Sequence, residues 1–214
     1  KMALRRLLEA AGSSHVASLK MLEKISLQGL DGTSKQARDL LEMGRSIRIG
    51  GKIRRVIELL QASLEQKIVF VNYLATLEYF HQILEEHKMP HVIYRGGMTT
   101  AQKQQSIQTF QEGCPILLST DTGGEGHNLQ FCHVMINCDL PWNPMQIEQR
   151  IGRIHRIGQK NEVQIYNFCS AGSLEDYMLE ILDRKINMFE LVVGEIDMIL
   201  GRLKGCLLYT SDAA

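Results

Sequence analysis

The spacing of apolar residues along the chain changes near residue 67. Before that point, leucines and isoleucines recur three or four positions apart, as in Leu19, Leu22 and Ile25. This spacing predicts amphipathic helices, and the glycines that interrupt it predict loops between them. We therefore expect residues 1–62 to form a helical segment that precedes a domain of another kind.

Short apolar runs alternate with helical stretches farther along the chain. The runs span residues 68–71, 91–94, 116–118, 134–136 and 163–168. Thr99 with Gln102 has the pattern of a capping box, and Asn143 precedes a proline, so each predicts the start of a helix. This alternation predicts an α/β fold for residues 63–170, with a parallel sheet covered by helices on both faces. Ligands of such sheets bind at the carboxyl ends of the strands.

The C-terminal part of the chain divides into two segments. Ser173 is expected to cap a long helix that continues to about Phe189, within a region of residues 171–204. Residues 205–214 continue neither the helical pattern nor a strand, and they resemble translated cloning sequence. We expect them to be a non-native tail.

Composition excludes several classes of protein. The chain has 214 residues, no apolar stretch long enough for a transmembrane helix, and five cysteines without a CxxC pair. These features predict a protein that is not secreted, either cytoplasmic or nucleoid-associated, or nuclear in a eukaryote. The net charge is zero, but basic residues gather at Arg45, Arg48, Lys52, Arg54 and Arg55. This group is either a phosphate-binding patch or a solvated helix face.

Two segments carry the candidate chemistry. The first, STDTGGEGHN at residues 119–128, directly follows a predicted strand, and its glycines allow backbone N–H groups to form an anion-binding nest or simply a tight turn. The second, QRIGRIHRIGQ at residues 149–159, predicts a helix with isoleucines on one face and Gln149, Arg153 and Arg156 nearly opposite. Adjacent guanidinium groups suit phosphate oxygens, although a surface ion-pair helix would show a similar pattern.

These segments resemble motifs V and VI of superfamily-two helicases. The longer string DLPWNPMQIEQRIGRIHRIGQ is very similar to Swi/Snf-type helicase-like ATPases, nearest the bacterial branch that includes the RNA-polymerase-recycling ATPase. IVFVNYLATLEYF resembles motif IV, and RGGMTTAQKQQSIQTF resembles the next conserved block, in which the family has arginine at the position of Lys103. The resemblance covers roughly residues 50–200 and implies the second RecA-like lobe of a two-lobed motor.

The resemblance also implies roles for individual residues. Two match the arginine fingers that reach the γ-phosphate of ATP and so act in catalysis: Arg153 and Arg156. Four match positions near the nucleotide: Gln149, Gly124, Gly126 and Asn128. Four are expected to contact a nucleic-acid backbone: Asn72, Ser119, Thr120 and Lys103.

Two motifs of a complete motor are missing from the sequence. No segment matches GxxxxGK[ST], and no Asp-Glu pair follows an apolar strand. The resemblance therefore implies that Mg²⁺ and most of the ATP are held by an N-terminal RecA-like lobe, and that this fragment alone is inactive. It implies a DNA partner, with RNA left open, and the histidine spacing predicts no metal site. Two alternatives stay open: a non-catalytic nucleic-acid-binding module, and an unrelated enzyme of phosphorylated small substrates that uses Asp121.

Overall fold

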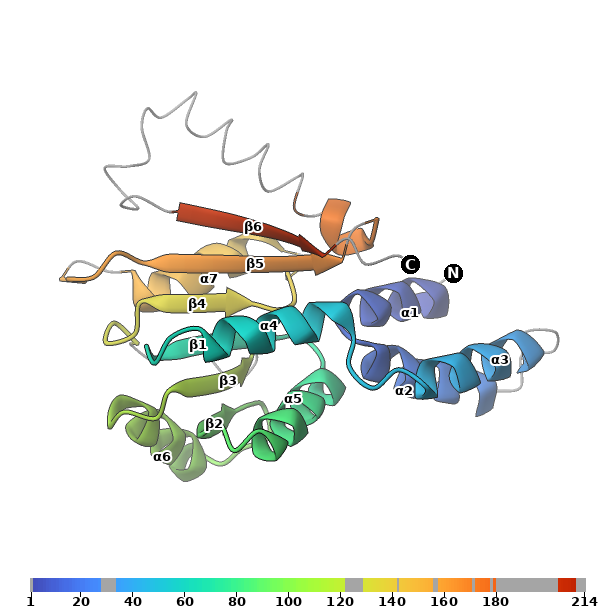
Figure 1. Cartoon of the computed structure of the whole chain (residues 1–214), viewed down its shortest axis with the longest axis horizontal. Helices are drawn as coiled ribbons and strands as arrows, with labels where there is room; N and C mark the ends of the chain where they lie inside the picture. Colours follow the sequence, from blue (N-terminus) through green and yellow to red (C-terminus); the bar gives the residue numbers. More distant parts are fainter. Residues whose placement is uncertain are drawn as a thin grey trace, which may run out of the picture.

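The computed structural model of the chain describes residues 2–27, 34–121, 129–141, 143–155, 158–170, 172–177, 179 and 204–210. In this part of the chain, a parallel sheet carries helices on both faces, and three further helices lie beside it (Figure 1). The predicted α/β class is therefore confirmed.

The sheet has six parallel strands in the order β2-β3-β1-β4-β5-β6. Their bounds are Lys67–Val71 for β1, His91–Tyr94 for β2, Ile116–Thr120 for β3, Val134–Asn137 for β4, Gln164–Ser170 for β5 and Lys204–Thr210 for β6. The first five match the predicted runs. The prediction that residues 205–214 continue no strand is wrong for residues 205–210, because β6 pairs with β5 along its whole length.

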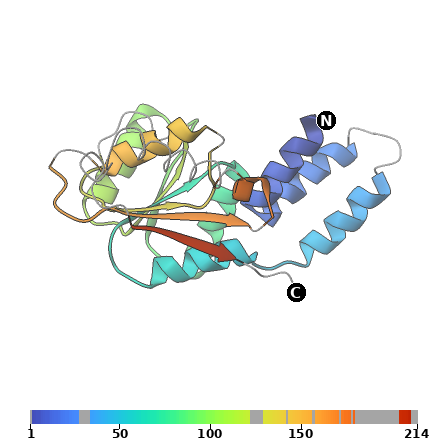
Figure 2. The same ribbon diagram turned by 90° about the horizontal axis from the view of Figure 1, so that it is seen from above.

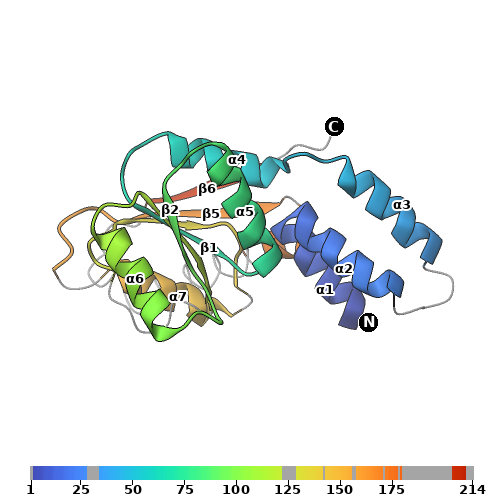
Figure 3. The same cartoon turned by 90° about the horizontal axis from the view of Figure 1, so that it is seen from below.

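The two faces of the sheet bury different sets of side chains, because successive residues of a strand point to opposite sides. On one face, Val69 and Val71 pack with apolar residues of α4 (Gly51–Gln61) and α5 (Leu74–Glu86). On the other face, Ile68 and Phe70 pack with residues of α6 and α7. Figure 3 shows α4 and α5 set apart from α6 (Thr100–Gln111) and α7 (Pro144–Ile154).

The three N-terminal helices lie beyond the carboxyl ends of the strands (Figures 1 and 2). They are α1 (Met2–Ser13), α2 (His15–Leu27) and α3 (Ser34–Arg45). Leu22 and Leu41 form a small buried cluster between α2 and α3. The carboxyl edge of the sheet is thus partly covered by chain that precedes it in sequence.

The predicted helix caps are present. Thr99 and Gln102 form both reciprocal hydrogen bonds of a capping box, and the side chain of Asn143 accepts from the N–H of Met145 at 3.1 Å. The hydroxyl of Ser173 accepts from the N–H of Glu175 at 3.2 Å. The remainder of the predicted helix after Ser173 lies mostly outside the described residues. No helix of the described part is long and apolar enough to cross a membrane.

Candidate nucleotide-facing edge of the sheet

Arg150 is the centre of a polar network at the carboxyl ends of the strands. Its side chain is 2% exposed, and its Nε donates to Asp121 Oδ1 at 2.6 Å. Its Nη2 lies 2.5 Å from the same carboxylate oxygen. Burial lowers the pKa of Arg150, but Asp121 opposes the shift and the guanidinium stays charged. The pair therefore carries a charge into the protein interior together with its counter-ion.

The remaining donors of Arg150 reach the neighbouring strands. Nη1 donates to Asn137 Oδ1 at 2.7 Å and to the carbonyl of Asp139 at 3.0 Å, and Nη2 donates to Asn72 Oδ1 at 3.0 Å. The guanidinium carbon lies 4.7 Å from the centre of the Phe70 ring. Since these residues belong to or follow β1 and β4, and Asp121 follows β3, one side chain of α7 binds the ends of three adjacent strands.

The sequence carries a signal for the burial of Arg150. Arg150 falls between Ile147, Ile151 and Ile154 at i, i+3, i+4 and i+7, so it lies on the apolar face of α7. An arginine in a buried stripe requires paired acceptors, because an unpaired buried charge is very costly. The stripe therefore predicts an internal ligand set for Arg150.

The polar face of α7 is shorter than predicted. Gln149 is exposed and Arg153 is half-buried, but the helix ends at Ile154 and His155 has an extended backbone (φ −103°, ψ 99°). Arg156 lies outside the described residues, so its place beside Gln149 and Arg153 stays a prediction. The helix ends here because groups outside it bind the carbonyls of its last turn. The side chain of Gln159, for example, donates to the carbonyl of Ile154 at 2.9 Å.

The predicted nucleic-acid contacts gather along the same edge of the sheet. Thr120 ends β3 and lies opposite the end of β1, just before Asn72, while Ser119 pairs in register with Tyr94 of β2. The ammonium of Lys103 lies 5.6 Å from the centre of the Tyr94 ring. The structure therefore brings these four candidates to the ends of three neighbouring strands.

Their side chains differ in how far they are available to a ligand. Ser119 is 2% exposed and donates to the carbonyl of Thr120, and Thr120 is 7% exposed and accepts from the N–H of Gly96 at 3.4 Å. Asn72 is half-buried, and its Nδ2 donates to the carbonyl of Leu140 at 3.1 Å, which leaves a second amide hydrogen. The phosphate contacts stay predictions. Gly124, Gly126 and Asn128 lie outside the described residues.

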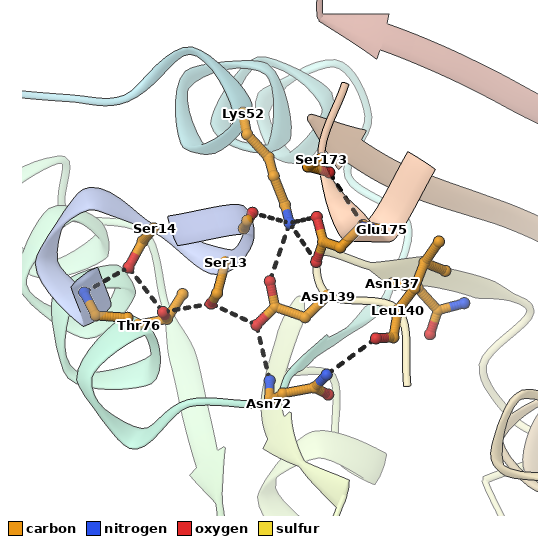
Figure 4. Close-up of polar contacts among 12 residues, drawn as sticks. Ser13, Ser14, Lys52, Asn72, Thr76, Asn137, Asp139, Leu140, Ser173 and Glu175 are labelled. Carbon is orange, nitrogen blue, oxygen red and sulfur yellow. Dashed lines mark hydrogen bonds and ion pairs between the residues drawn. The ribbon is translucent and has the colours of Figure 1, made fainter. Parts of the chain in front are cut away.

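A second buried cation lies beside this network (Figure 4). Lys52 of α4 is 6% exposed, and its Nζ donates to Asp139 Oδ1 at 3.0 Å and to Glu175 Oε2 at 2.8 Å. The same ammonium donates to the carbonyl of Gly12 at 2.8 Å. Asp139 Oδ2 in turn accepts from the hydroxyl of Ser13 at 2.7 Å. This cluster joins α1, α4, the end of β4 and the start of the C-terminal helix.

The charged groups of the Lys52 cluster shift one another's pKa values. Burial raises the pKa of Glu175 to about 7, with Lys52 opposing the rise and Asp139 adding to it. Burial alone would lower the pKa of Lys52, but the carboxylates of Asp139 and Glu175 outweigh it and raise that pKa above its ordinary value. The cluster holds one cation and two acids, so ionisation of Glu175 leaves it with an excess negative charge.

The predicted basic group is a surface feature without Lys52, because its four arginines are exposed. Lys52 is buried in the cluster above, and two of the arginines form exposed ion pairs, Arg45 with Glu23 at 3.2 Å and Arg55 with Glu58 at 2.9 Å. Lys52 is excluded from phosphate binding by its own carboxylate partners. The patch prediction is therefore wrong for this residue, because sequence order does not reveal acids that lie 87 and 123 residues away.

The acids at this edge are held by cations of the chain itself. Asp121 accepts from Arg150, and Asp139 accepts from Lys52, so neither offers an uncommitted carboxylate to Mg²⁺. The cationic group on the polar face of α7 is Arg153, which lies close enough to Tyr94 to oppose the burial that raises the pKa of that phenol. This part of the described edge suits the anionic end of a nucleotide better than its metal ion.

The sequence of this chain is similar to those of proteins named as helicases. Residues 51–158 match the family described as helicase conserved C-terminal domain. The uncharacterized ATP-dependent helicase YqhH of Bacillus subtilis is 40% identical over 200 residues, which are 90% of this chain and 35% of that protein. RNA polymerase-associated protein RapA of Haemophilus influenzae is 31% identical over 176 residues, which are 80% of this chain and 19% of RapA.

More distant similarity extends to eukaryotic proteins. DNA repair and recombination protein RAD54 of Oryza sativa is 29% identical over 177 residues, 79% of this chain and 18% of RAD54. The crystal structure of the C-terminal part of the Fun30 ATPase domain has the same fold, with a TM-score of 0.58 at 20% identity over 86% of this chain and 74% of that one. The chain spans about a third or less of the length of these curated relatives. It belongs to the helicase conserved C-terminal domain family, and its relatives include proteins named as ATP-dependent helicases.

Proposed function

We propose that this chain is the C-terminal lobe of an ATP-dependent translocase that moves along a nucleic acid, with double-stranded DNA as the track. In this function ATP binds between the chain and an N-terminal RecA-like lobe that holds Mg²⁺. Arg153 and Arg156 then act as arginine fingers, which stabilise the charge that develops on the transferred phosphoryl group. Gln149, Gly124, Gly126 and Asn128 line the nucleotide, while Asn72, Ser119, Thr120 and Lys103 face the track.

One observation supports this proposal above the others, namely the fixed position of α7. Arg150 holds the helix against the ends of β1, β3 and β4 through buried, charge-assisted hydrogen bonds. A finger that acts on a phosphate must be positioned before the reaction, since preorganised charges cost no rearrangement in the transition state. Arg150 is thus a positioning residue, and Arg153 is on the helix that it positions.

The same geometry argues against Asp121 as the acid of an unrelated enzyme. Its carboxylate accepts from Arg150 at 2.6 Å, and its side chain is only 26% exposed. A catalytic acid or nucleophile at this place would have to give up the counter-ion of a fully buried arginine. We therefore assign Asp121 to the support of α7.

The experiment uses the full-length protein, which in this proposal joins the chain to a lobe that carries a Walker A motif. Arg153→Ala and Arg156→Ala are each expected to lower DNA-stimulated ATP turnover by roughly 10³-fold or more, because an arginine finger contributes about 10³–10⁵. Nucleotide affinity should fall much less, because the other lobe holds most of the ATP. Glu148→Gln on the exposed side of the same helix is the matched control and should retain turnover.

Paired thermal melts separate chemistry from folding. Both arginine variants should melt within a few degrees of the wild type, since neither residue belongs to the isoleucine stripe. Near-normal turnover in both variants would refute the finger assignment. DNA binding that does not depend on ATP, together with absent turnover in the wild type, would favour a non-catalytic nucleic-acid-binding module instead.

A further inference from the structure

Three potential metal ligands meet at the amino end of the sheet, between α5 and β2. His81 and Glu85 are four residues apart on α5, so they lie on one face of the helix, and His91 is the first residue of β2. One nitrogen of each histidine and one oxygen of Glu85 all lie within 4.8 Å of one another. Their spacing in the sequence matches no common zinc motif, so the sequence alone predicts no site here.

The ligand atoms of these three side chains lie close enough together for one ion to contact all of them. His81 Nδ1 lies 2.7 Å from His91 Nε2, and Glu85 Oε1 lies 3.8 Å from the same His91 nitrogen. The side chain of His91 is 2% exposed, whereas that of Glu85 is 67% exposed. One ligand is therefore fixed in the interior, and the carboxylate is free to move toward it from the surface.

The hydrogen bonds of His91 select the nitrogen that faces the trio. Its Nδ1 lies 2.8 Å from the carbonyl of Met89, and a carbonyl oxygen can only accept, so Nδ1 carries the hydrogen and donates it. In the neutral ring Nε2 then keeps its lone pair and accepts from His81 Nδ1. An ion takes the place of this hydrogen once the neutral His81 ring carries its hydrogen on Nε2 instead. Metal-binding histidines are generally fixed in this way, with the second nitrogen bound to a carbonyl or carboxylate.

We propose that His81, Glu85 and His91 bind a divalent transition-metal ion, and that Zn²⁺ suits this ligand set best. Two imidazoles and one carboxylate, with a fourth position left for water, form a common zinc arrangement. Tetrahedral ligands at about 2.1 Å from the ion lie about 3.4 Å apart. The two histidine nitrogens must therefore move apart by less than 1 Å, and rotation of the exposed Glu85 side chain closes the remainder.

The place of the site in the fold indicates what the ion does. His91 begins β2 and pairs in register with Ile116, the first residue of β3, whereas Asp121 follows the last residue of β3. The trio thus lies at the amino ends of the strands, whereas the Arg150 network lies at their carboxyl ends. An ion there cross-links the last turn of α5 to the edge strand β2 and stabilises the lobe, independently of ATP.

The test uses the untagged chain after removal of metal by a chelator. Calorimetric titration with Zn²⁺ should give one equivalent of binding and raise the melting temperature. Co²⁺ should produce the visible absorption of a tetrahedral centre, without the intense near-ultraviolet band of cysteine ligation. Glu85→Gln and His81→Ala should each weaken Zn²⁺ binding by at least the roughly 10–100-fold that loss of an outer-shell partner costs.

Two exposed neighbours on the same turn provide matched controls. Glu86→Gln removes the same charge as Glu85→Gln, and His87→Ala removes an imidazole, and both should leave Zn²⁺ affinity unchanged. The proposal is overturned if the wild type binds no Zn²⁺ at one equivalent. It is equally overturned if Glu85→Gln and His81→Ala bind as tightly as the wild type, or if the controls weaken binding to the same extent.

Discussion

Replacement of Lys52 by methionine tests whether the buried cluster at the carboxyl edge stabilises the fold. Lys52→Met keeps the length and apolar character of the side chain but leaves Asp139 and Glu175 buried without their cation. Removal of one partner from a buried ion pair typically costs about 3–5 kcal/mol, since an uncompensated charge stays in the interior. For a chain of this size each kcal/mol corresponds to about 2–4 °C, so we expect the melting temperature to fall by about 6–20 °C.

The pH dependence of this loss follows from Glu175. Its pKa is raised from 4.5 to about 7, so the native state binds a proton more tightly than the unfolded state does. A raised pKa contributes stability that is fully present below pH 4.5 and is lost as the pH rises through about 7. Lys52 opposes this rise, so its removal raises the pKa of Glu175 further. The loss in Lys52→Met should therefore be larger at pH 8.5 than at pH 5.5, where Glu175 is protonated.

Urea denaturation of wild type and variant at both pH values measures this difference in free energy of unfolding. Arg55→Met is the matched control, because Arg55 is on the same helix in an ion pair with Glu58 whose side chains are 58% and 50% exposed. Exposed pairs contribute about 0–1 kcal/mol. Adding Glu175→Gln to Lys52→Met should recover part of the loss at pH 8.5. A loss below 1 kcal/mol at pH 8.5, or a larger loss at pH 5.5, would refute the reasoning.

Two further predictions concern α7 and α6. Arg150→Met should lower the free energy of unfolding by about 3–5 kcal/mol, because it leaves Asp121 without its cation. Arg150→Lys should recover only a small part of this loss, because lysine lacks the planar fork that reaches three strand ends. Equal unfolding midpoints for Arg150→Lys and the wild type would contradict this prediction. Thr99→Ala removes the capping box of α6 and should cost about 0.5–2 kcal/mol, measured by thermal melts against the exposed control Gln108→Ala.

Local signals in the sequence were sufficient for most of the fold. The caps at Thr99 and Asn143 depend on residues only two or three positions away, and both form as expected. The apolar runs of the first five strands depend only on burial on both faces. The strand at Lys204–Thr210 is not predictable in this way, because its sequence has no distinct alternation and only its pairing with β5 defines it.

The candidate site was harder to predict, because its buried charges depend on distant partners. The sequence groups Lys52 with exposed arginines, but its carboxylate partners are supplied by the end of β4 and by the C-terminal helix. The isoleucine stripe marks Arg150 as buried, but it does not identify the groups that accept from it. The partners of His91 are close in sequence, but the spacing of His81, Glu85 and His91 matches no common zinc motif.

The two buried cations, Arg150 and Lys52, share Asp139 as a partner. This shared residue predicts an energetic coupling between the N-terminal helices and α7. The carbonyl of Asp139 accepts from Arg150, and its carboxylate accepts from Lys52 and from Ser13 of α1. Residues in one hydrogen-bond network show interaction energies of about 0.5–3 kcal/mol in double-mutant cycles, whereas distant pairs add within about 0.3–0.5 kcal/mol. Ser13→Ala combined with Arg150→Lys should therefore deviate from additivity in urea denaturation, while Ser13→Ala combined with Thr99→Ala should not. Additivity in both cycles would mean that Asp139 does not transmit the position of α1 to α7, and that the two clusters stabilise the lobe separately.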